Sequence, residues 1–143
     1  MLIKSIATVC LGLLAANASA QCSTLTVTGT GAPGTSLTFD INGTDSHAFA
    51  LLAVGQTQGT TTIQLGPLGS LTLGLATPFI PVPLGLTNTS GDISRTINIP
   101  SAATFGVDLF GQGVTAAYSF QPTSPYISVT FCTSNVVGFH VGV

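Results

Sequence analysis

From residue 21 onward, short β-branched and apolar runs alternate with clusters of Gly, Pro, Asn and Asp. No stretch of this region keeps the apolar period of 3.6 residues that an amphipathic helix requires, so we predict an all-β chain. Many short runs separated by turn residues are typical of an antiparallel β-sandwich of Ig-like or jelly-roll type, here one domain with about eight or nine strands. Ten segments are the candidates for these strands, at residues 24–28, 36–41, 48–54, 60–65, 70–75, 92–99, 107–110, 114–120, 127–131 and 136–141.

The predicted connections are rich in turn-forming residues. Residues 60–65 and 70–75 are expected to pair as a hairpin, and residues 101–105 to form a short helical turn after Pro100. Residues 65–86 carry no charge, but four prolines exclude a membrane helix, since each costs about 3 kcal/mol in a helix interior. Strand and loop are expected there instead. The other predicted connections are residues 29–34, 42–45, 88–91, 111–113, 121–125 and 133–135.

The first 20 residues contain the parts of a secretory signal in order. Lys4 supplies the positive charge, residues 5–16 are uncharged and mostly apolar, and residues 18–20 form a small-residue cleavage site. The apolar run is too short for a hydrocarbon core that needs roughly 20 apolar residues. Lipid attachment at Cys22 is disfavoured, because Gln21 stands where that processing needs a small residue. We therefore predict a cleavable signal over residues 1–20 and a secreted or cell-surface domain over residues 21–143.

Cleavage would remove Cys10 and leave Cys22 and Cys132 in the mature chain. Two cysteines in an oxidising compartment favour one disulfide. That bond would close a loop of about 110 residues and stabilise the fold by on the order of 4 kcal/mol in the chain-entropy model. Two separate thiols are the alternative, since sequence does not show whether the two Cβ atoms meet.

The mature chain is almost uncharged. Arg95 is its one cation, and its place among the isoleucines of residues 92–99 predicts a position near a sheet edge or a partner. One Arg argues against nucleic-acid binding and against a polybasic membrane contact. Few charges also mean little self-repulsion and little protection of sheet edges, so the composition permits self-association. The carboxylates are Asp40, Asp45, Asp92 and Asp108.

Asp40, Asn42 and Asp45 place oxygen ligands of the kind Ca²⁺ prefers around a predicted turn. Their spacing differs from that of an EF-hand and no bidentate Glu follows, so a turn-forming role in a hairpin is the stronger interpretation. We predict no cofactor, with calcium at these three residues as a weak alternative. Asn42 and Asn88 each begin a glycosylation sequon, which matters only if the source glycosylates secreted proteins.

The residues suited to catalysis are few. Asp45, Ser46 and His47 are adjacent, but neighbours on a strand point to opposite faces and do not form a triad on their own. His140 lies between apolar residues of the last predicted strand, where an edge or rim position is expected. No spacing indicates a metal site that joins the two histidines to an Asp. We therefore predict a non-enzymatic protein without catalytic residues.

A series of turn and strand signatures resembles a known module. It consists of residues 65–69, the polar turn ending in Gly91, Pro100 after a strand, residues 111–113 and the C-terminal segment 133–142. Together they resemble a secreted β-sandwich module of uncharacterised function, common in extracellular proteins of planctomycete-type bacteria. The resemblance implies an extracellular or cell-surface domain with no catalytic residues to carry over. Here the domain stands alone behind its own signal, which favours a free-standing subunit.

The leading functional hypothesis is a secreted structural or interaction protein that self-associates as a filament, matrix or coat subunit, through uncharged Thr-rich faces and unguarded strand edges. A carbohydrate- or calcium-dependent binding module is the alternative, although the chain has no Trp and only two Tyr. A small outer-membrane β-barrel is a lesser alternative, favoured by the alternation of Phe139, Val141 and Val143 and disfavoured by the prolines. The expected partners are further copies of the chain, a glycan or another cell-surface molecule.

Overall fold

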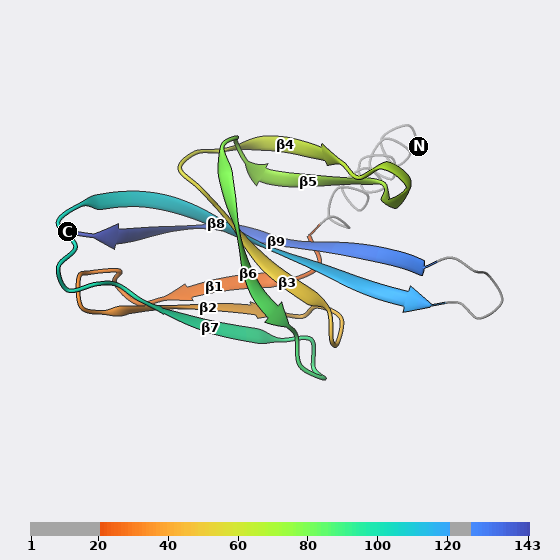
Figure 1. The fold of residues 1–143 in the computed structure, drawn as a ribbon, viewed down its shortest axis with the longest axis horizontal. Coiled ribbons are helices and arrows are strands. Elements are labelled where there is room, and N and C mark those ends of the chain that lie inside the picture. Colours follow the sequence, from red (N-terminus) through yellow and green to blue (C-terminus); the bar gives the residue numbers. More distant parts are fainter. Residues whose placement is uncertain (1–20, 121–126) are drawn as a thin grey trace, which may run out of the picture.

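The computed structural model describes residues 21–120 and 127–143; the predicted signal and the predicted loop 121–125 lie outside these residues. The described part of the chain forms nine β-strands and one short 3₁₀ helix (Figure 1). The all-β prediction is confirmed. The elements are β1 (Thr24–Thr28), β2 (Ser36–Asn42), β3 (Phe49–Gly55), β4 (Gln58–Gln64), η1 (Gly66–Leu68), β5 (Ser70–Leu75), β6 (Phe79–Leu86), β7 (Ile93–Asn98), β8 (Gly106–Phe120) and β9 (Ile127–Gly142).

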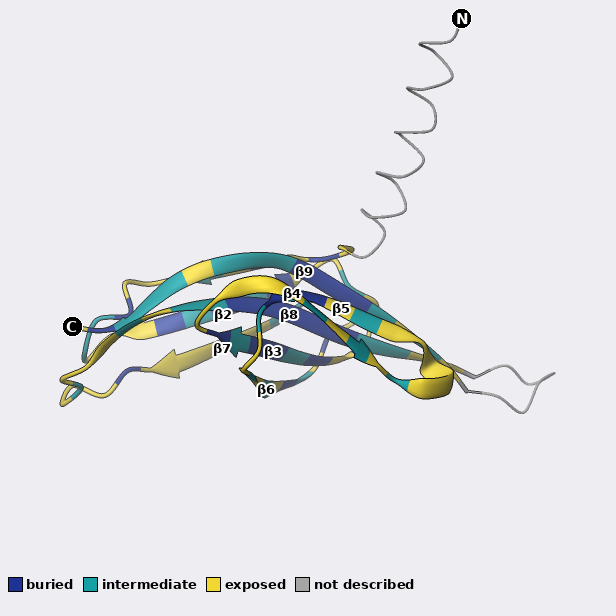
Figure 2. Ribbon diagram, turned by 90° about the horizontal axis from the view of Figure 1, so that it is seen from above, coloured by how far each residue is buried: buried dark blue, intermediate teal, exposed yellow. Residues whose placement is uncertain are grey.

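Two antiparallel sheets pack face to face as a sandwich. One has the strand order β1-β2-β7, and the other has the order β6-β3-β8-β9. The predicted hairpin is confirmed as the separate pair β4-β5, which lies on the outer side of the four-stranded sheet (Figures 1 and 2). The four-stranded sheet is therefore the middle layer and is covered on both faces.

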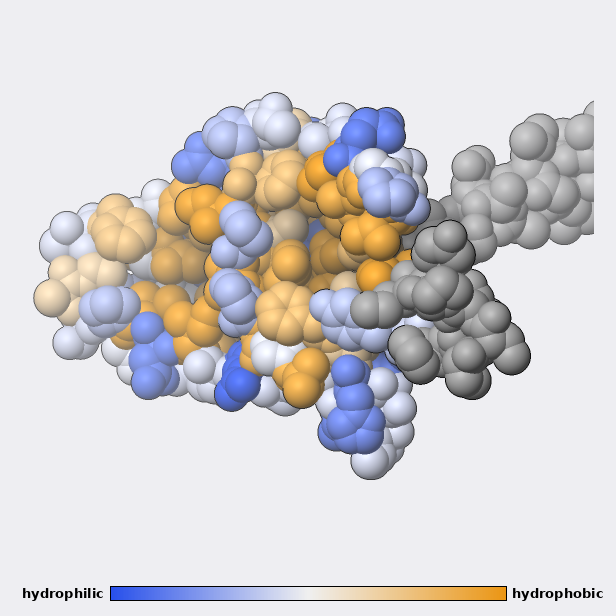
Figure 3. All heavy atoms as spheres, turned by 45° about the vertical axis from the view of Figure 1, so that its right-hand side comes forward, coloured by the Kyte–Doolittle hydropathy of each residue, from blue (hydrophilic) through white to orange (hydrophobic). Residues whose placement is uncertain are grey.

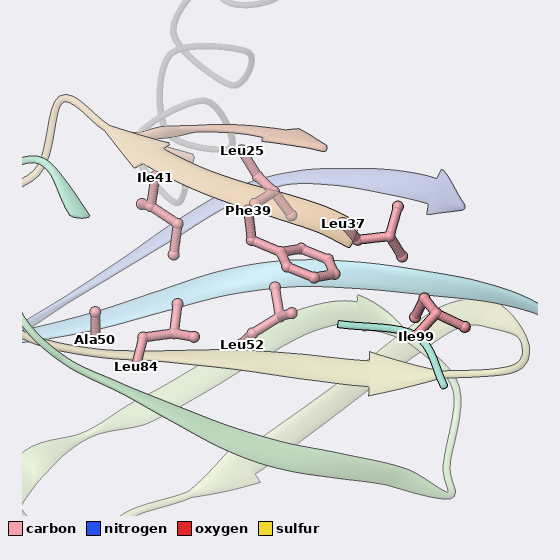
Figure 4. Packing of buried hydrophobic residues seen from close by; sticks show 8 residues of the cluster. All are labelled: Leu25, Leu37, Phe39, Ile41, Ala50, Leu52, Leu84 and Ile99. Atoms are coloured by element: carbon pink, nitrogen blue, oxygen red, sulfur yellow. The ribbon is translucent and has the colours of Figure 1, made fainter. Parts of the chain in front are cut away.

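The main core lies between the two sheets. Alternation in β2 turns Leu37, Phe39 and Ile41 inward, and all three are buried. Figure 4 shows them facing Ala50 and Leu52 of β3 across the interior. Each large apolar side chain buried in this way contributes about 1.5–3 kcal/mol relative to an exposed one. The apolar residues that alternate with polar ones in the sequence are therefore the residues that pack between the two sheets.

A second cluster attaches the β4-β5 hairpin to the outer face of the middle sheet. Leu73 and Leu75 of β5 pack with Ala53 and Val114. The buried side chain of Gln112 strengthens this contact, because its Oε1 accepts a hydrogen bond from the backbone N–H of Gly74 in β5 at 2.8 Å. A buried amide with a backbone partner fixes the position of the hairpin as well as stabilising it.

The two C-terminal strands are longer than predicted. Residues 111–113 and 133–135 were expected to separate strands, but β8 and β9 run through both segments. The pairing shifts between Gln112 and Val114, so these segments face each other at a β-bulge. Within it, the Ser134 hydroxyl accepts a hydrogen bond from Gly113 N–H at 2.7 Å. Small and polar residues therefore mark an irregularity inside a paired ribbon.

The stretch predicted as strand and loop contains strand β6 at residues 79–86, an edge strand, where proline is tolerated. Two further predictions are corrected. The predicted turn at residues 42–45 does not close a hairpin, because β2 and β3 belong to different sheets and the segment between Asn42 and Phe49 crosses between them. Residues 101–105 form no helical turn: Ala103 N–H donates to Pro100 O at 3.2 Å in an isolated turn.

Cys22 and Cys132 form the predicted disulfide, with their Cα atoms 5.6 Å apart. The bond joins the segment before β1 to the middle of β9. Beside it, Cys22 N–H donates to Thr133 O at 3.0 Å, and Gln21 forms a parallel bridge with Thr133. One covalent bond and a short piece of backbone pairing thus hold the two sheets together on this side.

Candidate functional site: the edges of the sandwich

The sheets of the sandwich end in four edge strands, which are β1 and β7 in one sheet and β6 and β9 in the other. An edge strand presents a row of unpaired N–H and C=O groups to any chain that can pair with it. How each edge is covered therefore decides where this almost uncharged molecule can bind another extended strand.

The β1–β9 side is closed by side-chain and loop contacts. The Asn135 amide takes the place of a neighbouring strand: its Oδ1 accepts from Leu25 N–H at 2.8 Å, and its Nδ2 donates to Leu25 O at 3.2 Å. At the other end of β9, Gly142 N–H donates to Gly31 O at 2.8 Å. Gly31 has a φ of 72°, and a Cβ there would overlap the carbonyl oxygen of His140, so this close approach requires glycine.

The β6 edge is protected by its own sequence. Pro81 and Pro83 lie opposite Ala53 and Leu51 of β3. Proline has no N–H, so the free side of β6 lacks donors at these two positions. The outer strand β4 of the separate hairpin carries another protective device, a register shift between Gln58 and Thr61. Neither strand offers a regular template for pairing.

β7 is the contrasting case. Its pairing with β2 is continuous from Ile93 to Asn98 and contains neither proline nor bulge. Except for Ile93, every residue of β7 is exposed, as Figure 2 shows along the strand. β7 is therefore regular and exposed along its length, without the prolines of β6 or the register shift of β4.

The direction of the backbone groups of β7 follows from the alternation of hydrogen-bonded pairs. Leu25 bonds outward to Asn135 and lies opposite Ile41, so Ile41 directs its own N–H and C=O toward β7. Ile93, Arg95 and Ile97 then exchange hydrogen bonds with β2. The N–H and C=O groups of Ser94, Thr96 and Asn98 point away from the sheet, and no hydrogen bond to them occurs within residues 21–120 and 127–143.

The outer face beside this edge is flat and polar. Thr28, Thr38 and Thr96 form one row across β1, β2 and β7, and the hydroxyls of Thr38 and Thr96 are hydrogen-bonded at 3.1 Å. In the next row, Ser36 Oγ donates to Asn98 Oδ1 at 2.7 Å. These short, uncharged side chains pair within the sheet. They place no Lys beside the edge, which is the usual means of blocking strand addition.

Arg95 lies on this edge strand, as expected for a cation among isoleucines. Its side chain is on the inner side of β7, where Nε donates to Leu84 O of β6 at 2.7 Å. An inward charge is one of the ways in which proteins discourage edge pairing. In this case the guanidinium reaches across to β6, so it links the two edge strands and leaves the outward backbone groups of β7 uncovered.

The candidate calcium ligands lie on two elements. Asp40 and Asn42 are on the outer face of β2, whereas Asp45 is exposed in the crossing segment. In the described residues, no three His, Cys, Asp or Glu side chains group as a metal site would require. The carboxylate that holds this region together is that of Asp92, whose Oδ1 accepts from Gly43 N–H at 3.2 Å. Calcium binding stays an untested prediction.

The two sequons are both exposed. Asn42 is at the end of β2, and Asn88 begins the turn before β7. Asn88 Oδ1 accepts from the backbone N–H groups of Ser90 and Asp92 at 2.9 and 3.0 Å, so the side chain also shapes its turn. Glycosylation at either position stays a prediction.

Asp45 and His47 contact neighbouring segments through backbone atoms. Asp45 O accepts from the Thr87 hydroxyl at 2.7 Å, and His47 N–H donates to Asn88 O at 3.4 Å. His47 has a φ of 55°, and it is exposed together with Asp45 and Ser46. These bonds tie the crossing segment to the turn before β7, a structural role.

His140 has a partner that the sequence did not reveal. It lies opposite Asp108 across the β8-β9 pair, with Nδ1 2.7 Å from Asp108 Oδ1 and Nε2 3.0 Å from Val143 O. The hydrogen bond to Asp108, followed by the bond to Val143 O, raises the pKa of His140. Both acceptors favour a ring that donates from both nitrogens, which is the charged imidazolium. With both nitrogens engaged, the ring is held in place on the edge strand.

No protein-family model, curated protein or solved structure matches this chain. The resemblance to a secreted bacterial module therefore stays a prediction. Within the described residues, no helix is long and apolar enough to span a membrane.

Proposed function

We propose that this is a secreted, non-enzymatic structural or interaction protein whose copies associate through the edge strand β7. The observation that supports the proposal is the row of outward N–H and C=O groups at Ser94, Thr96 and Asn98 on a regular, exposed strand. Strand addition supplies backbone hydrogen bonds without any need for charge, which suits a chain with so few charged residues.

The same edge on two molecules favours a two-fold pair. Because Asn135 of β9 contacts β1 and because β6 carries prolines, we take a second β7 in antiparallel orientation as the partner of one β7. The resulting sheet would run continuously through both molecules. About six hydrogen bonds would form at the centre, each with a net contribution of about 0.5–1.5 kcal/mol.

Apolar side chains on the same side would add to this contact. Ile80 and Leu86 of β6 are 68% and 63% exposed, and Ile97 of β7 is 40% exposed. Figure 3 shows apolar residues gathered across the middle of the face in view, with some polar residues among them and the most hydrophilic residues above and below. An apolar surface framed by polar residues is a common feature of interaction sites.

A pair of matched substitutions tests the proposal. Thr28 and Thr96 flank Thr38 on its two sides in one row of the outer face, but only Thr96 belongs to the proposed interface. Thr96→Lys would bring two positive charges together in the two-fold pair, so the mass of residues 21–143 in solution should fall to that of a monomer. Thr28→Lys should leave the association of the wild-type chain intact.

Light scattering after size-exclusion chromatography, over a hundredfold range of protein concentration, measures the mass of both variants in solution. Equal behaviour of Thr28→Lys and Thr96→Lys would place any association elsewhere. A wild-type chain that stays monomeric at every concentration and forms no ordered assembly by electron microscopy would contradict the proposal itself.

A further inference from the structure

The core contains an apolar cavity at the end of the sandwich next to β6 and β7. Its volume is about 180 Å³, and hydrocarbon side chains from both sheets line it. It adjoins a hollow of about 400 Å³ beside the β3–β4 turn, and the two spaces share Val54 and Leu109. The main contributors from the core are Leu37, Phe39, Leu52 and Ile99, whose side chains Figure 4 shows between the layers.

The cavity is open to solvent between the two edge strands. Ile97 of β7 lines it and is 40% exposed, and Val82 of β6 lines it from the opposite sheet. Ile80, which is 68% exposed, lines the adjoining hollow. Apolar side chains therefore line the way from the surface into the core, where water gains few hydrogen bonds, while Gln56 and Thr57 add polar groups to the lining of the adjoining hollow.

Arg95 lies on β7 beside this opening, although it is not among the residues that line either space. Arg95 precedes Ile97 by two residues on the same face of β7, and its partner Leu84 follows Val82 by two residues on β6. Only Nε of Arg95 has a partner in the described part of the chain, so the terminal guanidinium nitrogens are free to donate. Apolar walls with a free guanidinium beside them suit a molecule with an apolar tail and an anionic head.

We propose that the cavity binds the hydrocarbon tail of a medium-chain carboxylate and that Arg95 binds its head group. An apolar cavity of about 150 Å³ accepts a benzene-sized molecule, so the space here suits about six to eight carbon atoms, as in octanoate. The adjoining hollow gives a longer tail room to continue. The charged pair of carboxylate and guanidinium fixes the orientation of the ligand. This inference does not depend on association of the chain.

Octanoate and octanol, added separately to residues 21–143, test the two parts of the site. We expect octanoate to shift the methyl NMR signals of Leu52, Val82 and Leu109 in a saturable way, and octanol to bind more weakly. Arg95→Gln should weaken octanoate binding about tenfold or more, as expected for a lost hydrogen bond to a charged group, and leave octanol binding unchanged. Equal affinity for octanoate in the Arg95→Gln variant would overturn the role of Arg95.

A filled cavity provides the second test. Val82→Phe should abolish binding of both compounds, whereas Val129→Phe, a matched change on β9 away from the cavity, should preserve it. If Val82→Phe does not fold, Ile97→Phe at the exposed mouth replaces it. Absence of saturable shifts in the wild-type protein at millimolar octanoate would overturn the site, and so would shifts confined to residues away from the cavity.

Discussion

At the scale of single residues, polar side chains form hydrogen bonds to backbone groups that a neighbouring strand would pair with in a regular sheet. Asn135 completes the edge of β1, Gln112 attaches the outer hairpin, and Ser134 fills the bulge. Each makes its bonds to backbone groups. In a chain with four carboxylates and two cations, neutral amides and hydroxyls therefore supply most of the specific polar contacts.

The pair of Asp108 and His140 gives a prediction about pH. Asp108→Asn removes the largest cause of the raised pKa, so the pKa of His140 should fall toward the ordinary value of about 6.5. Asp45→Asn, which changes an exposed carboxylate outside this pair, should leave it unchanged. The titration of the ring proton signals in the two variants and the wild type measures the effect.

The sign of the stability effect follows from the raised pKa. The folded state binds the proton of His140 more tightly than the unfolded state does, so the contribution of the pair is fully present below the unfolded pKa. It is lost as pH rises through the folded pKa. The wild type should thus exceed Asp108→Asn in stability more at pH 6 than at pH 9. A difference that grew with pH would contradict the assignment.

At the scale of elements, the turn signals in the sequence had more than one meaning. The hairpin of residues 60–75 was predicted correctly, because its loop joins neighbouring strands. Gly111 to Gly113 and Thr133 to Asn135 carry the same kinds of residue but form a bulge. Local composition does not distinguish these cases, since the difference lies in the partner strand. The alignment of Asp108 with His140 was missed for the same reason, because it depends on which strands pair and in which register.

Asn135 provides the prediction at this scale. Asn135→Ala would leave the N–H and C=O groups of buried Leu25 without their partner, and we expect a loss of about 1–3 kcal/mol in the free energy of unfolding. Urea denaturation measures it. Asn98→Ala, which removes only an exposed bond to the Ser36 hydroxyl, should cost within about 0.5 kcal/mol. Equal losses would show that Asn135 does not close the β1 edge.

At the scale of the whole molecule, the class of fold and the disulfide were predictable. The alternation of apolar and polar residues identifies each strand from its own sequence, and two cysteines in residues 21–143 allow a single intramolecular disulfide. The candidate site was predictable only in kind, as an unguarded edge. Which edge is free depends on contacts between residues far apart in sequence, such as Leu25 with Asn135, which are separated by 110 positions. No local pattern identifies them.

The sandwich thus has one side closed by a disulfide and an amide, and an opposite side with a regular free strand, exposed isoleucines and an apolar opening. This asymmetry is the basis of both proposals. Both proposals therefore locate their contacts, one with a second copy and one with an apolar ligand, on the β6–β7 side.

Hydrogen exchange of the β7 amides tests the central claim most directly. In dilute solution, the N–H groups of Ser94, Thr96 and Asn98 should exchange quickly, while those of Ile93 and Ile97, bonded to β2, stay protected. At high concentration, pairing with a second β7 should slow the first three amides and leave the other two unchanged. Exchange at Ser94, Thr96 and Asn98 that is independent of protein concentration would contradict association through this edge.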